Sequence, residues 1–141
     1  MASIVYTSFL NDVFAGNCNT THSYKAMLVT SSYTEDRAAH SKRSNVTNEV
    51  TGTGYTAGGA TVTLTFAVNT TTHKGTLTVG AVSWPSSTIT ARKMVVYRAR
   101  GGASSADELV CCIDNGVNVS SSANTLSVAA STWEIPLPAP V

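Results

Sequence analysis

Apolar and polar residues alternate along most of the chain, with the period of two that a half-buried β-strand requires. The clearest case is the segment 61–69, in which threonines alternate with Val62, Leu64, Phe66 and Val68. We expect these four apolar side chains to be buried, since they fall on one face of the strand. The other expected strands are bounded by Gly, Pro, Asn and Ser, and they are residues 24–30, 76–84, 88–98, 109–114 and 126–130.

One helix is expected near the N-terminus, from Tyr6 to Ala15. Its apolar residues recur at helical spacing, and Gly16 follows where a left-handed C-terminal cap belongs. These apolar residues are Phe9, Leu10, Val13 and Phe14. Isolated helices of this length are marginally stable in water, so the apolar face should be packed against the strands.

A glycine-rich stretch precedes the clearest strand. The residues from Gly52 to Ala57 formally fit the dinucleotide-binding pattern G-x-G-x-x-G/A. That pattern binds a pyrophosphate only where a strand precedes it and a helix follows it, whereas here a strand follows. We therefore expect the glycines to provide positive φ angles in a connection whose backbone passes close to another strand.

The composition favours an all-β domain. Charged residues make up 12% of the 141 residues, the net charge is +1, and Thr and Val are frequent. We expect one domain over residues 1–141, a sandwich or partly open barrel with one short N-terminal helix and extended arms. The small net charge and the lack of a long apolar segment give no reason to expect nucleic-acid or membrane partners.

Two segments are candidate arms. Residues 31–59 are polar and poorly periodic, and residues 133–141 carry prolines at 136, 138 and 140, which disfavour sheet pairing. Long irregular segments gain order by docking, so we expect interface residues in both. The candidates are Arg37, His40, Lys42 and Arg43 in the first arm, and Trp133, Ile135 and Leu137 in the second. For the positive cluster, a solvated and charge-balanced surface is an equally good interpretation.

The three cysteines are Cys18, Cys111 and Cys112, and their spacing does not fit a metal site or a redox motif. One interpretation is that they are small buried hydrophobic residues. The other is a disulfide from Cys18 to one of the adjacent pair, or a bond between subunits. Because neighbouring residues of a strand face opposite sides, we expect at most one of the pair in the main core and the other at an interface.

Catalytic chemistry is not indicated. The sequence has no nucleophile-elbow motif, and His22, His40 and His73 lack metal-ligand spacing. The paired carboxylates are sequence neighbours, which a strand would direct to opposite faces. We expect no enzymatic activity and no bound cofactor or metal.

Several blocks of the sequence resemble a family of small virion structural proteins of tailed bacteriophages. The resemblance covers most of the chain and keeps the order of the blocks. These are Met27-Leu-Val-Thr-Ser-Ser-Tyr-Thr34, His40, Val46-Thr-Asn-Glu-Val-Thr-Gly-Thr-Gly-Tyr-Thr-Ala-Gly-Gly59, Ser86-Ser-Thr-Ile-Thr-Ala-Arg92 and Val95-Val-Tyr97. The cysteine pair at 111 and 112 and the proline-rich tail depart from the family.

The resemblance implies a non-enzymatic structural component of a phage particle, assembled in the bacterial cytoplasm. The first expectation is a homo-oligomeric capsid decoration or cement protein that binds the shell of the major capsid protein or other virion proteins. The alternative is a tail, neck or receptor-binding, lectin-like component of the virion.

Overall fold

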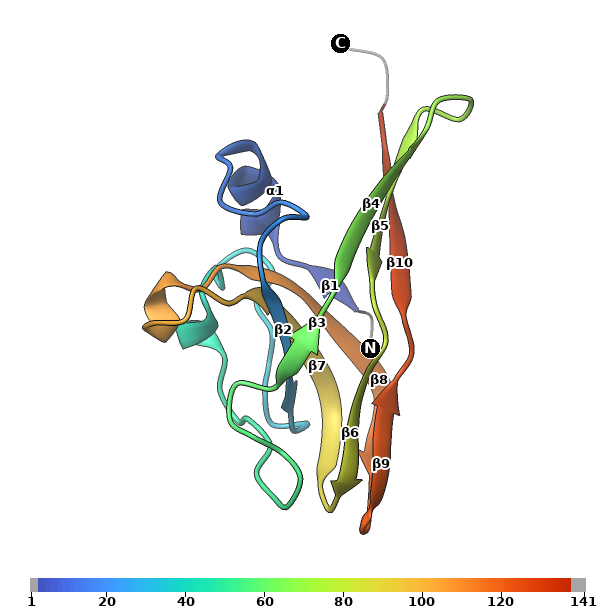
Figure 1. Ribbon diagram of the computed structural model, residues 1–141. Coiled ribbons are helices and arrows are strands. Elements are labelled where there is room, and N and C mark those ends of the chain that lie inside the picture. Colours follow the sequence, from blue (N-terminus) through green and yellow to red (C-terminus); the bar gives the residue numbers. More distant parts are fainter. Residues whose placement is uncertain (1–2, 138–141) are drawn as a thin grey trace.

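The computed structural model describes residues 3–137, which form a β-sandwich-like fold with one short α-helix (Figure 1). The sequence-based prediction of an all-β architecture is confirmed. The strands are β1 (Ile4–Val5), β2 (Tyr24–Val29), β3 (Ala60–Val62), β4 (Leu64–Asn69), β5 (Lys74–Val79), β6 (Val82–Ser87), β7 (Thr90–Arg98), β8 (Leu109–Ser120), β9 (Asn124–Val128) and β10 (Ser131–Pro136). The helices are α1 (Thr7–Phe14) and the 3₁₀ turns η1 (Arg43–Asn45) and η2 (Ser104–Ala106).

The first layer is an antiparallel sheet with the strand order β1-β8-β7-β2-β3. Strand β7 lies at its centre, where Val95 is aligned with Met27 of β2 and with Cys112 of β8. Strand β8 continues to Ser120, past the predicted end at residue 114, because its polar second half pairs with the beginning of β7.

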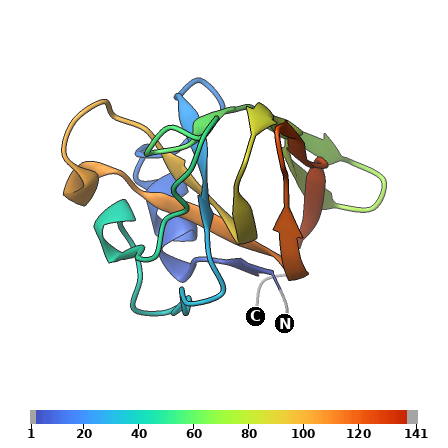
Figure 2. The same ribbon diagram turned by 90° about the horizontal axis from the view of Figure 1, so that it is seen from below.

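The second layer consists of a three-stranded sheet, β10-β5-β4, and a two-stranded sheet, β6-β9. Two chain segments run through both parts with short interruptions, since β5 leads into β6 and β9 leads into β10. A third segment connects the layers, since β3 of the five-stranded sheet leads into β4. Viewed from below, red β9 and β10 lie on one side of β2 and the cyan 3₁₀ turn η1 lies on the other (Figure 2). The five-stranded sheet is therefore covered on both faces.

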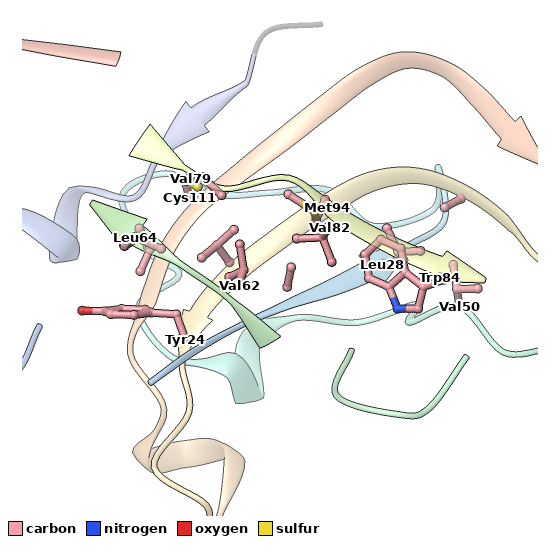
Figure 3. Packing of buried hydrophobic residues seen from close by; sticks show 14 of the residues in the cluster. Tyr24, Leu28, Val50, Val62, Leu64, Val79, Val82, Trp84, Met94 and Cys111 are labelled. Atoms are coloured by element: carbon pink, nitrogen blue, oxygen red, sulfur yellow. The ribbon is translucent and has the colours of Figure 1, made fainter. Parts of the chain in front are cut away.

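The main core fills the space between the two layers (Figure 3). Leu28 of β2 and Met94 of β7 pack there with Val82 and Trp84 of β6, and all four side chains are buried. The alternation of apolar residues explains this directly, since it directs one side of each strand toward the opposite layer.

A second cluster covers the outer face of the five-stranded sheet. Tyr33 and Val46, from the connection between β2 and β3, pack there with Tyr6, and the hydroxyls of Tyr6 and Tyr33 are hydrogen bonded at 2.8 Å. Isolated bridges join the same connection to β2, to Glu108 just before β8 and to Thr88 between β6 and β7. Residues 31–59, a candidate arm from the sequence, thus lie on the body of their own chain.

The glycine-rich stretch behaves as the sequence predicts. Gly59 has a φ of +81°, and a Cβ atom at this position would lie 1.8 Å from the carbonyl oxygen of Ala26 in β2. Gly54 has a φ of +80°, and its Cβ would lie 2.7 Å from the Cα of Ser87. Both positions require glycine because the backbone of the connection touches neighbouring strands.

Helix α1 spans Thr7–Phe14, close to the prediction, and Gly16 follows it with a φ of +80°. The expectation that its whole apolar face is packed is wrong. Phe9 is buried, but Val13 is 42% exposed and Phe14 is 85% exposed. The helix contacts β8, and a groove separates it from the three-stranded sheet, so part of its apolar surface has no neighbour.

The C-terminal segment is a strand up to Pro136. Strand β10 pairs with β5 along its whole length, and Trp133 packs against the main core. Because β10 is an edge strand and Pro136 lies at its end, the missing N–H group does not interrupt the sheet. This corrects the prediction that residues 133–136 form an unpaired arm. The rest of that candidate arm, residues 138–141, lies outside the described residues.

Candidate interaction surface

The three-stranded sheet of β4, β5 and β10, here called the blade, has one apolar and one polar face. Phe66 of β4 is aligned with Leu77 of β5, which is aligned with Trp133 of β10. One step further along, Val68 and Ile135 occupy the same face. The opposite face carries threonines, Lys74 and Glu134.

The five-stranded sheet, the β6-β9 sheet and the segments packed on them are here called the body. Only the half of the blade's apolar face nearest the body is covered. Leu64 and Leu77 are 5% exposed, whereas Phe66 is 49%, Val68 59% and Leu137 64% exposed. The blade extends past the end of the five-stranded sheet, so that its outer half faces no opposing layer (Figure 1). This corrects the prediction that Phe66 and Val68 are buried, while Leu64 agrees with it.

An apolar groove of about 340 Å³ runs between α1 and the blade. Phe9 and Val13 line it from the helix, and Leu64, Phe66 and Ile135 line it from the blade. No residue that lines the groove carries a charge. The groove therefore offers shape and apolar contacts, and it lacks the ion pairs that would select a charged ligand.

Gly75 determines how the Phe66 ring lies on the blade. A Cβ atom at Gly75 would lie 2.6 Å from the tip of that ring. The ring thus covers the glycine diagonally across the two strands, as aromatic residues do beside glycines in edge strands. This contact holds an exposed aromatic side chain flat against the sheet.

The predicted positive cluster lies apart from the blade, where residues 31–46 lie beside the residues that precede β8. Each of its members has a bonding partner in the same chain. Arg43 Nε donates to Asp107 Oδ2 at 2.8 Å, and Lys42 Nζ lies 3.7 Å from Glu108 Oε2. The remaining two members also bond within the chain: Arg37 donates to a backbone carbonyl of β1, and His40 Nδ1 bonds the hydroxyl of Tyr33. Lys42 and Arg43 are thus paired with carboxylates, whereas Arg37 and His40 bond to neutral groups.

Glu108 is the centre of this network and is fully buried. Burial acts to raise its pKa, but the hydrogen bonds from Arg100 and the charges of Lys42 and Arg100 together hold the pKa below its usual value. The carboxylate is therefore charged in the folded protein at neutral pH. Its role is to fix η1, η2 and the end of β7 relative to each other.

A second buried ion pair attaches the 31–46 segment to the central strand. Lys93 of β7 bonds to Glu35, and the two side chains are only 7% and 6% exposed. The same ammonium group donates to the carbonyl of Tyr33 at 2.9 Å. No pattern in the sequence marks this pair, because its members are 58 residues apart.

All three cysteines are free and buried. Cys111 and Cys112 face opposite sides of β8, as the sequence predicts, but both sides are core: Cys111 joins the main cluster and Cys112 joins the outer one. Burial raises the pKa of Cys18 to about 11 and that of Cys112 to about 12. The structure thus agrees with the interpretation of small buried residues and with the expectation that at most one of the pair joins the main core. No disulfide is formed within the described chain, and the interface role of a cysteine stays a prediction.

Two further properties hold for the part of the chain that the structure describes. Among residues 3–137, no group of three or more His, Cys, Asp and Glu side chains is arranged to hold a metal ion. Within the same residues, every helix falls short of the length and hydropathy that crossing a membrane would require.

Comparisons with protein-family models, with curated proteins and with solved structures found no match. The candidate surface therefore rests on the geometry of the blade. Trp133, Ile135 and Leu137, which the sequence suggests as interface residues, are on the blade, and their interface role stays a prediction. The sequence does not indicate the groove wall formed by α1, because the helical spacing of its apolar residues predicts burial.

Proposed function

We propose that this protein is a non-enzymatic structural subunit of a tailed-phage particle, in the first place a capsid decoration or cement protein that binds the shell of the major capsid protein. The proposal combines the resemblance of the sequence to phage virion proteins with one structural observation. That observation is the uncovered apolar half of the blade, with Phe66, Val68 and Leu137 at its surface.

An exposed apolar surface of this kind favours a role in assembly. Contiguous apolar patches are uncommon on monomeric proteins and mark places where another molecule binds. Here the patch lies on a projecting part of a β-domain whose charges are largely paired internally. A subunit of a larger particle needs a rigid body and an apolar contact surface, and the chain offers both.

The copy number of the chain in purified virions tests the location. We expect a ratio to the major capsid protein that corresponds to hundreds of copies per particle, as a decoration of the whole shell requires. A few copies to a few dozen would instead assign the chain to the tail or neck. Absence of the chain from purified virions would refute the proposal.

Charge substitutions on the two faces of the blade test the contact surface. Val68→Asp and Leu137→Asp place a carboxylate on the apolar face, and we expect both to reduce the amount of bound protein per particle. Thr65→Asp and Thr132→Asp are the matched controls, since they add the same charge to the same two segments on the polar face. Equal losses from both faces would show that the apolar face is not the contact.

A further inference from the structure

Strand β4 is a free edge of the blade, because β5 is its only partner in the sheet. Its sequence is Leu64-Thr-Phe-Ala-Val-Asn69, which contains no charge and no proline. Its pairing with β5 is regular from end to end. Edge strands with these properties pair readily with further strands, and proteins normally protect them with charges, prolines, bulges or shortness.

The other edges of the described sheets lack this combination of features. Strands β1 and β3 have only two and three residues, β6 contains Pro85 and an irregular register, and β10 carries Glu134 and Pro136. Strand β9 is uncharged and free of proline, but its Leu126 is buried. Past Cys112, β8 also has no partner opposite β7 and exposes Val117, but this half carries the charged Asp114 and a positive φ angle at Gly116. Among the described edges, only β4 combines regular pairing and a lack of charge and proline with two exposed large apolar side chains, those of Phe66 and Val68.

The direction of the free backbone groups follows from the pairing on the other side of β4. Gly80 N donates to Thr63 O at 2.8 Å, and hydrogen-bonded positions alternate along an antiparallel pair. The N–H and C=O groups of Thr65 and Ala67 therefore point toward β5. Those of Leu64, Phe66 and Val68 point away from it, along the free edge.

We propose that two copies of this protein associate through β4, in antiparallel orientation, to form one continuous six-stranded sheet from two blades. A two-fold axis through Phe66 matches the free groups of one strand to those of the other: Phe66 faces Phe66 of the partner subunit, and Leu64 faces Val68 of the partner subunit. A closed interface of this type is isologous, so each copy contributes the same surface.

The chemistry of β4 favours a second copy over a charged partner. Every cross-strand pair in this register is uncharged, so the two copies meet without the like-charge repulsion that a charged strand would have with itself. On the apolar face, the pairing also brings together the two exposed phenylalanines and places each Val68 beside Leu64 of the partner subunit. The free edge thus acquires its partner, and the apolar faces of the two blades join into one larger surface that stays open to the shell.

This inference adds a specific contact to the proposed function, and it is tested on the purified chain without virions. We expect sedimentation equilibrium of the full-length protein to show a reversible monomer–dimer equilibrium. If the chain remains a monomer up to millimolar concentration, the inference is overturned, while the proposed contact of the apolar face with the shell is unaffected. Absence of the chain from virions would refute the proposed function and leave the dimer intact.

Val68→Pro tests the edge itself. Proline removes an N–H group that points away from β5, so each subunit loses one hydrogen bond to its partner, two per dimer, and none within the blade. Val68→Ala is the matched control, because it shortens the same side chain and keeps the N–H group. We expect the dissociation constant of Val68→Pro to exceed that of Val68→Ala by about tenfold or more, which corresponds to a loss of one to two hydrogen bonds. Equal dissociation constants in two folded variants would overturn β4 pairing.

A cross-linking experiment keeps the inference testable even if Val68→Pro fails to fold. Directly opposed residues of a hydrogen-bonded pair have Cα atoms about 5.5 Å apart, which is within the range of a disulfide. Phe66→Cys should therefore oxidise rapidly to a covalent dimer, while the buried native cysteines stay reduced. Ile135→Cys, on the same face at the opposite edge, is the control. Faster dimer formation by Ile135→Cys would place the contact on β10 and overturn the inference.

Discussion

Replacing Glu35 with glutamine is expected to destabilise the protein by about 3 to 5 kcal/mol, the usual cost of leaving a buried charge without its partner. Glutamine keeps the size of the side chain, so the cost comes from the Lys93 ammonium group, which is 7% exposed. That group retains only neutral hydrogen-bond acceptors, the Tyr33 carbonyl at 2.9 Å and the amide oxygen of the introduced glutamine. Neutral acceptors do not replace the attraction of a carboxylate in a buried site.

An exposed ion pair of the same chain provides the control. Lys74 and Glu134 lie 2.8 Å apart on the polar face of the blade, but their side chains are 42% and 59% exposed. Exposed pairs of this kind contribute about 0 to 1 kcal/mol, so Glu134→Gln should be nearly neutral. The difference between the two variants isolates the effect of burial.

Urea unfolding followed by circular dichroism measures both changes as shifts of the midpoint at constant slope. The double variant Lys93→Met with Glu35→Leu should recover the loss or gain about 1 to 4 kcal/mol, since an apolar pair of similar size has no desolvation cost. A loss below about 1 kcal/mol for Glu35→Gln would refute the reasoning. It would mean that residues 31–46 do not dock on β7 and that the segment is a free arm after all.

Three other predictions follow from burial and charge. Phe66→Ala should lower the free energy of unfolding by only about 1 kcal/mol, since roughly half of the ring is already exposed, whereas Leu77→Ala should lower it by about 2 to 5 kcal/mol. Urea unfolding of both variants measures the difference, and equal losses would contradict the half-covered blade. Ellman's reagent should label no thiol in the native protein and all three in denaturant, and rapid native labelling would show that a cysteine is accessible. The folded pKa of Glu108 lies below the ordinary value of 4.5, so its contribution to stability is complete above that pH and is lost as the pH falls toward the folded pKa. Glu108→Gln should therefore make the stability of the protein depend less on pH on the acid side. An unchanged dependence on pH would argue against a charged Glu108.

The strands were predictable because their alternation is a local property. This local pattern does not determine which residues of a face are buried, as the segment around Leu64 shows. Leu64, Phe66 and Val68 have the same period and share a face, yet only Leu64 is buried. Periodicity assigns residues to a face, but what covers that face depends on the distance to the other layer, which no local pattern contains.

The ion pairs were not predictable for a related reason. The sequence indicates that Arg43 belongs to a positive cluster, but its partner Asp107 is 64 residues away in the sequence. Nothing local to the adjacent acidic residues at 107 and 108 indicates that Glu108 is fully buried. Long-range pairing of charges requires the fold, because the connection from β2 to β3 must first be placed on the sheet.

The way the blade joins the body determines how it responds to force. Backbone passes from body to blade at three places: β3 runs into β4 across Thr63, β5 runs into β6 across residues 80–81, and β9 runs into β10 across residues 129–130. A load on the tip would therefore be shared by three parallel backbone connections, and rotation about one bond would not bend the blade. Such a junction would transmit torque from the tip of the blade to the rest of the domain through all three connections.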